Sequence, residues 1–307
     1  MALLQPGDII DIVAPGSACS ADVFQKSILW LKAQGFVPRF PNDILSPQIF
    51  ISHSDEKRLS YLLQALEAKD SKAVWCLRGG YGALRLLPEL KRIKKLKTKK
   101  WFIGYSDITT LHQWLNQKMD WVTLHGPLLD RGGLGLFTEA EKNELLSILT
   151  GQTSETYFDN LVPVNLAAEK FKSGQKQLMG RILGGNLTVY ASSLGSFLSP
   201  DKNKKHILFL EDVGERGYRL DRLLNQLYNA DVFKHCQAVL LGDFIGGQET
   251  NGENHVDSTL SQFFAKLKIP VFKGLSVGHG PVQRTLILNS HAKLTCDQRA
   301  RLIVFTS

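Results

Sequence analysis

The sequence predicts an α/β protein with two domains. Two observations lead to this prediction: strand and helix signals alternate along the first hundred or so residues, and the periodicity fades between about residues 151 and 176 before strand signals return. Alternating strands and helices are typical of a parallel sheet covered by helices on both faces. With 307 residues and 43% hydrophobic content, the chain is long enough to form two cores.

The first domain is expected to cover residues 1–150. Its strands are expected at short apolar runs, and its helices where apolar residues recur every three or four positions. Gly35 ends the first helical pattern, and Asp55 opens the second. The predicted elements are, in order, a strand at residues 8–15, a helix over 23–31, a strand at 37–40, a helix over 55–66 and a strand at 73–77.

The stretch 151–176 is polar and without a clear period, so it is expected to be a linker. The second domain is expected to cover residues 177–307, and its elements are again inferred from apolar runs. They are strands at 207–210, 238–241, 271–275, 286–288 and 302–305, and a helix that carries Leu220, Leu223, Leu224 and Leu227 on one face.

Composition argues against several classes of protein. The four cysteines (Cys19, Cys76, Cys236 and Cys296) form no C-x-x-C pair, so neither a disulfide framework nor a zinc knuckle is indicated. The N-terminus lacks a basic region followed by an apolar one, and no apolar run approaches the length of a membrane span. These observations predict a cytoplasmic protein that does not act at a membrane.

The net charge of +8 comes almost entirely from one short segment. The run K-R-I-K-K-L-K-T-K-K at residues 91–100 contains seven basic residues and no acidic one, so the rest of the chain is nearly neutral. Such a run is usually a solvated helix end or a loop. Because no aromatic platform and no helix-turn-helix signature accompanies it, nucleic acid is not an expected partner.

Ser106 lies in the stretch G-Y-S-D-I-T, between a predicted strand at 101–103 and a helical pattern formed by Ile108, Leu111 and Leu115. A serine on a sharp strand-to-helix turn is typical of a nucleophile elbow, and Gly104 would permit that turn. The second glycine of G-x-S-x-G is absent, however, and serine and aspartate are also common helix N-caps. The stretch alone leaves both interpretations open.

The glycine-rich segment R-G-G-Y-G follows the predicted strand at 73–77. Loops of this kind expose backbone N–H groups to an anion. The segment matches neither the P-loop G-K-[ST] nor G-x-G-x-x-G, so it does not indicate a nucleotide site. Gly79 and Gly80 end a strand of the same predicted sheet as Ser106, so their amides suit an oxyanion hole. A tight turn that needs positive φ is the alternative.

A carboxylate and a histidine also follow predicted strands. Glu211 and Asp212 come directly after the strand at 207–210, and either can orient a histidine or cap the next helix. His279 lies between two glycines on a loop after the strand at 271–275. A hydroxyl nucleophile needs a base, and the base needs a carboxylate, so Ser106, Glu211 and His279 form a candidate triad. The eight histidines show no metal-binding spacing, so neither a metal nor a cofactor is expected.

Five motifs together resemble those of the LD-carboxypeptidases, the muramoyltetrapeptide carboxypeptidase family of serine peptidases. The motifs are R-G-G-Y-G-A-x-R-L-L, G-Y-S-D-I-T, L-G-G-N-L, L-F-L-E-D and G-H-G, in this order over essentially the whole chain. Each motif alone is weak, whereas five in register are specific.

The resemblance implies a Ser-His-Glu triad at Ser106, His279 and Glu211, with an oxyanion hole formed by the amides of Gly80 and Asp107. It also implies an N-terminal domain like the class I glutamine amidotransferases, a smaller C-terminal α/β domain, a site in the cleft between them and a homodimer. The candidate substrate contacts are Asn186 of G-G-N-L and Arg219, for which a solvated surface position is the alternative.

The implied reaction removes the terminal D-alanine of a murein tetrapeptide, free or linked to UDP-MurNAc, during cytoplasmic peptidoglycan recycling. Whether the third substrate residue is diaminopimelate or lysine stays open. One alternative is an immunity peptidase of the microcin C type, a relative in the same family that cleaves aminoacyl nucleotide analogues. Another is a non-catalytic α/β protein that binds nucleotides through the R-G-G-Y-G loop or nucleic acid through residues 91–100.

Overall fold

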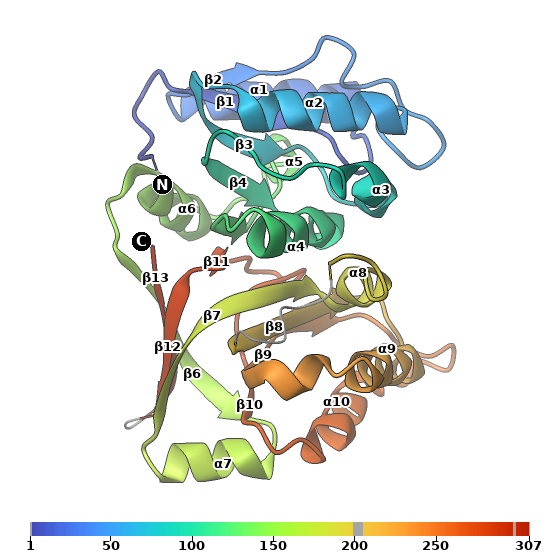
Figure 1. Cartoon of the computed structure of the whole chain (residues 1–307), viewed down its shortest axis with the longest axis vertical. Helices are drawn as coiled ribbons and strands as arrows, with labels where there is room; N and C mark the ends of the chain where they lie inside the picture. Colours follow the sequence, from blue (N-terminus) through green and yellow to red (C-terminus); the bar gives the residue numbers. More distant parts are fainter. Residues whose placement is uncertain (1, 199–204, 297–298, 307) are drawn as a thin grey trace. The chain divides into compact units, whose positions relative to one another are not determined.

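A computed structural model of the chain describes residues 2–198, 205–296 and 299–306. The chain divides into two compact units (Figure 1). Unit 1 comprises Met1–Thr153 and Arg284–Leu286, and unit 2 comprises Ser154–Gln283 and Ile287–Ser307. Within the described ranges, no helix is long and apolar enough to cross a membrane.

Unit 1 is built on a six-stranded sheet with the order β11-β5-β4-β3-β1-β2. Neighbouring strands from β5 to β2 pair in parallel, which confirms the predicted parallel sheet. The strands are β1 (Ile9–Val13), β2 (Val37–Arg39), β3 (Ser71–Cys76), β4 (Trp101–Gly104), β5 (Thr123–His125) and β11 (Leu286–Leu288).

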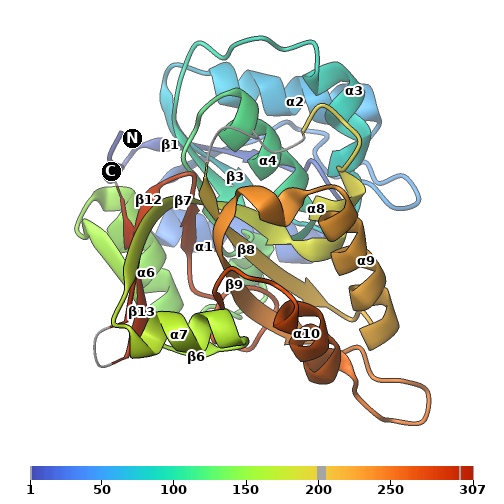
Figure 2. The same cartoon turned by 60° about the horizontal axis from the view of Figure 1, so that its bottom comes forward.

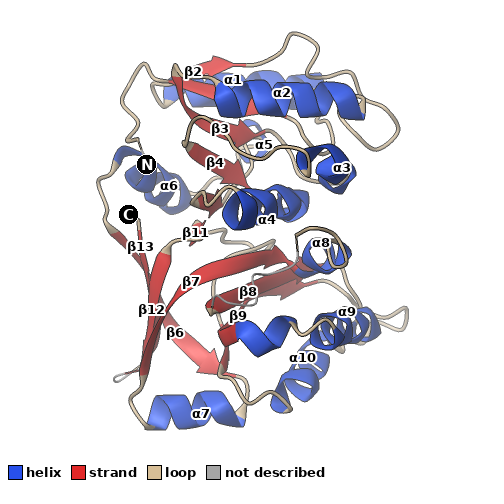
Figure 3. Ribbon diagram, viewed as in Figure 1, coloured by secondary structure: helices blue, strands red, loops and turns tan. Residues whose placement is uncertain are grey.

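Helices cover both faces of this sheet (Figure 3). In the β3–β4 register, Trp75 lies opposite Ile103 and Val74 opposite Phe102, so Trp75 and Phe102 point to different faces. Trp75 packs edge-on against Trp30 of α1, and Phe102 against His112 of α4. The helices are α1 (Ala21–Ala33), α2 (Asp55–Glu67), α3 (Leu87–Leu90), α4 (Thr109–Lys118), α5 (Asp130–Gly133) and α6 (Glu139–Thr150).

The basic run at residues 91–100 forms turns and loop between α3 and β4. Its last residue, Lys100, is not solvated but buried. The ammonium group donates to the carbonyl of Ala65 at 2.9 Å and to the hydroxyl of Ser71 at 2.6 Å, and it also contacts the carbonyl of Ala68. Burial lowers the pKa of Lys100 to about 8. This lysine therefore helps to hold the C-terminal end of α2 on the sheet.

Unit 2 contains a closed, seven-stranded mixed barrel with the order β10-β6-β13-β12-β7-β8-β9 (Figure 2). Strands β7, β8, β9 and β10 pair with one another in parallel, whereas every pair that involves β6, β12 or β13 is antiparallel. The strands are β6 (Glu155–Pro163), β7 (Gln177–Asn186), β8 (His206–Val213), β9 (Cys236–Ile245), β10 (Val271–Lys273), β12 (His291–Cys296) and β13 (Ala300–Phe305).

Helices α8 (Leu187–Ser192), α9 (Gly217–Asn229) and α10 (Val256–Ala265) pack on the parallel strands of the barrel. The predicted apolar face of α9 contributes Leu220, Leu224 and Leu227 to the core they share with β8 and β9. Figure 2 shows α9 and α10 outside the barrel. The parallel part of unit 2 is thus an α/β arrangement, as predicted.

The prediction of a linker at residues 151–176 needs correction. This stretch contains β6 and α7 (Leu166–Ser173), both of which belong to unit 2. Along β6, buried and exposed residues alternate except at Asp159 and Asn160, but two of its apolar residues, Tyr157 and Val162, lie on the exposed side. Because the strand leaves apolar residues on its outer side, its sequence lacks the alternation by which strands are recognised.

Candidate active site

Ser106 lies on a sharp strand-to-helix turn, the elbow, in unit 1. The chain leaves β4 through Tyr105 in an extended conformation, and Ser106 then has a φ of +64° at the start of the short 3₁₀ helix η2 (Ser106–Ile108) before α4. A positive φ is uncommon for serine, and a strained strand-to-helix turn is the defining feature of such an elbow. A helix-cap serine would instead have an extended backbone, so the conformation favours the nucleophile interpretation.

Gly104 allows the elbow to be tight. A Cβ at this position would lie 3.0 Å from Cγ2 of Ile108 and 3.1 Å from Cβ of Cys76, closer than side chains normally approach. From Trp101 to Asn116, Ser106 is the one residue that is not buried. The elbow therefore presents the serine at the carboxyl edge of the sheet while its neighbours fill the core.

The glycine-rich loop after β3 lies against Ser106. A Cβ on Gly79 would be 3.0 Å from Cβ of Ser106, so a larger residue here would crowd the serine. Gly80 has a φ of +84°, and the N–H of Ser17 donates to the carbonyl of Gly79 at 2.8 Å. Within the described part of the chain, the N–H of Gly80 donates to no acceptor.

Asp107 joins the elbow to this loop through its side chain, a contact that the sequence analysis did not anticipate. The carboxylate is buried and accepts a hydrogen bond from the N–H of Ala83 at 2.9 Å. Burial raises the pKa of Asp107, while backbone N–H groups of Ala83 and Gly82 and the charge of Arg58 oppose that rise. The aspartate of the motif S-D therefore positions the glycine-rich loop next to the elbow.

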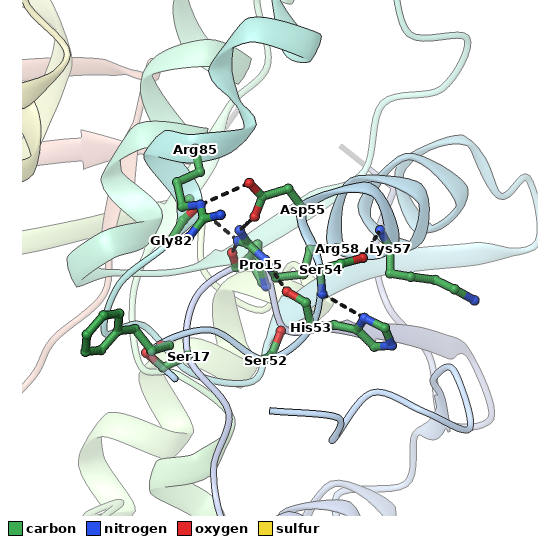
Figure 4. A network of polar contacts seen from close by, with 12 residues as sticks. Pro15, Ser17, Ser52, His53, Ser54, Asp55, Lys57, Arg58, Gly82 and Arg85 are labelled. Carbon is green, nitrogen blue, oxygen red and sulfur yellow. Dashed lines mark hydrogen bonds and ion pairs between the residues drawn. The ribbon is translucent and has the colours of Figure 1, made fainter. Parts of the chain in front are cut away.

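Arg58 is buried in unit 1 and ties three loops together (Figure 4). Its guanidinium donates to the carbonyl of Pro15, to the carbonyl of Gly82 at 3.0 Å and to the carbonyl of His53 at 3.1 Å. It also pairs with Asp55 at 2.6 Å. These contacts connect the loops after β1 and β3 with the segment before α2, so Arg58 supports the backbone around the elbow. Its position inside a helical pattern gave no sign of this.

His112, in α4, supports the elbow through hydrogen bonds to the ends of β4 and β5. Its Nε2 lies 2.8 Å from the carbonyl of Gly104 and its Nδ1 lies 2.9 Å from the hydroxyl of Thr123, which also accepts from Nδ2 of Asn116 at 2.9 Å. Since a carbonyl only accepts, Nε2 carries the proton and Nδ1 accepts from Thr123. Burial lowers the pKa of His112 to about 4, so the ring is neutral at pH 7.

Glu211 and His279 form a hydrogen-bonded pair in unit 2. Oε2 of Glu211, at the end of β8, lies 2.7 Å from Nδ1 of His279. The Glu211 side chain is fully buried, whereas that of His279 is 16% exposed. Burial raises the pKa of Glu211, and the hydrogen bond from His279 opposes that rise. A carboxylate at Nδ1 favours the tautomer with the proton on that nitrogen, which leaves Nε2 as the acceptor.

The glycines that flank His279 allow this close approach, as expected from G-H-G. Gly278 has a φ of +134°, and a Cβ there would lie 2.8 Å from Oε2 of Glu211. The N–H of Gly280 donates to Oδ2 of Asp243 at 3.2 Å. Asp243 follows a buried run in β9, the same signal that singled out Glu211, but the sequence analysis did not consider it.

The remaining candidates differ in environment. Asn186 is buried; it caps α8 by accepting from the N–H of Val189 at 3.1 Å and donates to Asp212 at 3.1 Å. Asp212 also accepts from Thr188, so Glu211 contacts the histidine while Asp212 holds the end of β7. Arg219 has a side chain that is 55% exposed and lies 3.6 Å from Glu215.

Two other sequence-based expectations concern metals and cysteines. Among the described residues, no group of three or more His, Cys, Asp and Glu side chains is arranged to hold a metal ion. Cys76 is buried in β3, and burial raises the pKa of its thiol, as is typical of a cysteine that packs in a core.

Comparison with known protein families assigns both units. Residues 10–126 match the LD-carboxypeptidase N-terminal domain, and residues 179–294 match the LD-carboxypeptidase C-terminal domain. The chain therefore belongs to the LD-carboxypeptidase family of serine peptidases. A Rickettsia conorii protein with a provisional carboxypeptidase name is 36% identical over 83% of this chain and 78% of its own length.

Two relatives have more specific names. The murein tetrapeptide carboxypeptidase of Pseudomonas aeruginosa is 29% identical over 90% of this chain and 89% of its own. The crystal structure of muramoyltetrapeptide carboxypeptidase from Oxalobacter formigenes superposes with a TM-score of 0.83 at 28% identity, covering 97% of this chain and 98% of that one. The microcin C7 self-immunity protein in complex with aspartyl sulfamoyl adenosine has the same fold, with a TM-score of 0.83 at 21% identity and coverage of 99% and 97%.

Proposed function

We propose that the protein is a serine carboxypeptidase in which Ser106 is the nucleophile, His279 the general base and Glu211 the carboxylate that orients it. The observation that carries this proposal is the elbow at Ser106, with its φ of +64° and the glycine-rich loop packed against it. The 2.7 Å contact between Glu211 and Nδ1 of His279 supports the other two roles. Such an acid–base pair is what a serine hydroxyl needs for activation.

The proposed reaction has two steps. His279 accepts the proton of Ser106 at Nε2 as Oγ bonds to the scissile carbonyl carbon, and it then passes this proton to the leaving amine as the C–N bond breaks. A water molecule next attacks the acyl-enzyme with His279 again as base, which releases the shortened peptide and restores the hydroxyl. Glu211 stabilises the imidazolium in both steps. No bound metal enters this scheme.

The N–H groups of Gly80 and Asp107 are proposed to form the oxyanion hole. Gly80 is supported by its place in the loop beside Ser106 and by an N–H that has no acceptor in the described part of the chain. Asp107 follows the nucleophile directly, as the residue that supplies one donor does in elbow enzymes. The loss of one such donor typically costs about 100-fold to 1,000-fold in kcat.

The proposed substrate is a murein tetrapeptide, free or linked to UDP-MurNAc, from which the terminal D-alanine is removed. The names of the Pseudomonas aeruginosa and Oxalobacter formigenes relatives support this choice. The proposal places the protein in the cytoplasm, in peptidoglycan recycling, as a homodimer. Asn186 and Arg219 remain candidate substrate contacts; of these, Arg219 has the more accessible side chain.

Mass spectrometry of UDP-MurNAc-tetrapeptide incubated with the protein tests the proposal. The wild-type chain is expected to remove one alanine with or without a chelator, whereas Ser106→Ala is expected to remove none. Glu211→Gln is expected to retain a fraction of the activity on the order of 10⁻⁴, because it removes the charge that orients and stabilises His279.

Two outcomes would contradict the proposal. Full activity in Ser106→Ala would exclude the serine mechanism, and no loss of alanine with folded wild-type protein would exclude this substrate. In the second case, hydrolysis of an aminoacyl-sulfamoyl adenosine by the wild type but not by Ser106→Ala would instead identify the microcin C type of activity.

A further inference from the structure

Arg78 is a cation held at the carboxyl edge of the unit 1 sheet. It is the last residue before Gly79 and Gly80, and its side chain is 45% exposed. Nη1 lies 3.2 Å from Oδ2 of Asp130, whose own side chain is only 8% exposed. Among the described residues, Asp130 is the one hydrogen-bond or ion-pair partner of the guanidinium. Because a guanidinium has five N–H donors, most of them remain available to a ligand.

The partner of Arg78 is itself firmly placed. Asp130 begins α5, and its backbone N–H donates to the carbonyl of Leu77, the residue before Arg78, at 3.0 Å. Burial raises the pKa of Asp130, and the charge of Arg78 opposes that rise. The pair therefore holds the guanidinium in a fixed position just after β3, while most of its N–H donors remain available.

The position of Arg78 matches the geometry that a carboxypeptidase requires. In a peptide with a free C-terminus, three bonds separate the scissile carbonyl carbon from the terminal carboxylate carbon, a span of less than about 4 Å. The group that binds this carboxylate must therefore lie near the oxyanion hole. Since adjacent Cα atoms are about 3.8 Å apart, the Cα of Arg78 lies within about 8 Å of that of Gly80, and an arginine side chain covers this distance.

Other arginines around this edge are already engaged. The guanidinium of Arg58 donates to three backbone carbonyls and pairs with Asp55. Arg85 also pairs with Asp55, at 2.9 Å, and Arg131 is largely buried against Glu141 at 3.3 Å. Arg58 and Arg131 are largely buried, whereas Arg85, at 46% exposed, is as accessible as Arg78. Arg78 differs from Arg85 in its position, because it directly precedes the two glycines of the loop that contacts Ser106.

We propose that Arg78 binds the free α-carboxylate of the C-terminal residue that is released, and so restricts the enzyme to the ends of peptides. The inference rests on the proposed function, because it takes Ser106 as the nucleophile and Gly80 as an oxyanion donor. A bidentate guanidinium–carboxylate contact on the leaving residue selects substrates with a free carboxyl group over those with a blocked one.

The test compares two substrates that differ only at the C-terminus: the tetrapeptide ending in D-alanine and the same peptide ending in D-alaninamide. The wild type is expected to prefer the free acid by at least about 100-fold in kcat/KM, the loss typical of removing a charged partner. Arg78→Gln is expected to lose about 100-fold on the acid and less than about threefold on the amide. Arg92→Gln, a change at a 75% exposed arginine that pairs with Glu89 on the surface, is the matched control and should keep the wild-type preference.

Removing Arg78 alone leaves the buried Asp130 without its ion-pair partner, so a general loss of structure is the rival explanation. The double variant Arg78→Gln/Asp130→Asn removes both charges and should show the same selective loss on the acid, with a melting temperature closer to that of the wild type. Arg78→Lys keeps the charge but not the bidentate geometry, and an intermediate preference is expected.

Other outcomes would overturn the proposal. If the Arg78 variants retain the preference for the free acid, or lose the acid and amide activities equally, Arg78 does not bind the carboxylate. A wild-type protein that cleaves both substrates equally would also exclude a carboxylate subsite, while its dependence on Ser106 would leave the proposed mechanism intact. If the wild type cleaves neither, the proposed function itself fails, and the carboxylate subsite fails with it.

Discussion

At Ser106, the backbone has a φ of +64°, a conformation that costs a non-glycine residue about 1–3 kcal/mol. Neighbouring residues must supply the contacts that maintain it. Asp107, the residue after Ser106, accepts a hydrogen bond from the glycine-rich loop, and His112 holds the end of β4 at the carbonyl of Gly104. Single buried polar side chains thus hold the elbow in its shape, and a change in their protonation state is expected to change the stability of the fold.

The neutral state of His112 predicts a loss of stability in acid. Its pKa is about 4 in the folded chain, below the ordinary value of about 6.5, so between these pH values the unfolded chain binds a proton that the folded chain does not. Stability therefore falls as the pH is lowered through this window, by about 3 kcal/mol in total. Urea unfolding at pH 7.5 and pH 5.0 should show a smaller difference in His112→Gln than in the wild type. Equal differences would contradict the assignment.

At the scale of elements, the candidate residues gather at the carboxyl ends of parallel strands in each unit. In unit 1, the ends of β3 and β4 carry the glycine-rich loop and Ser106. In unit 2, the ends of β7, β8 and β9 carry Asn186, Glu211 and Asp243. Parallel strands bring their carboxyl ends to one edge, so residues far apart in the chain become neighbours. The loop after β10 then needs glycines to bring His279 close to Glu211.

Gly278→Ala is expected to reduce kcat by about 100-fold or more, because a displacement of His279, the proposed base, by about 1 Å is enough for such an effect. The new Cβ would lie 2.8 Å from Oε2 of Glu211, at a residue whose φ is +134°. Steady-state kinetics and thermal unfolding together check the prediction. Gly252→Ala is the matched control, since Gly252 also has a positive φ, +87°, but a Cβ there would meet nothing within 4 Å. Similar kinetics in both variants would exclude a positioning function for Gly278.

At the scale of the whole molecule, unit 1 is discontinuous in sequence. The chain leaves it after Thr153 and returns at Arg284–Leu286, where β11 forms the edge of the sheet. Arg284 pairs with Glu144 of α6 at 2.5 Å, and the same carboxylate accepts from the N–H of Thr285 at 3.0 Å. A residue late in the chain therefore completes the fold of the first half.

The Arg284–Glu144 pair is expected to contribute to the stability of unit 1. Its side chains are 30% and 15% exposed, and Nε of Arg284 also contacts the carboxylate at 2.9 Å. A double-mutant cycle with Arg284→Ala and Glu144→Ala, followed by urea unfolding, should give a coupling of about 1–3 kcal/mol. The Lys142–Glu139 pair on the same helix is the control; with Glu139 80% exposed, its coupling should stay below about 1 kcal/mol. Equal couplings would contradict this prediction.

Local sequence patterns predicted many of the elements. The alternation in the first hundred residues located β1, α1, β2, α2 and β3, because each buries a face whose period is visible in a few consecutive residues. The stretch 155–173 was missed, since β6 exposes Tyr157 and Val162 and so lacks a clear period. The closure of the barrel was also beyond prediction, because pairing between β10 and β6 joins segments about a hundred residues apart.

By itself, the sequence determined the family, the parallel sheet of unit 1 and the positions of Ser106, Glu211 and His279 beside strand ends, because these follow from motifs and from contacts between near neighbours in the chain. The tertiary structure alone decided the positive φ of Ser106, the pairing of His279 with Glu211 rather than Asp212, and the positions of Arg58, Arg78 and Asp243. These features depend on side chains that meet across loops and strands distant in sequence, and no local pattern records which of them will pack together.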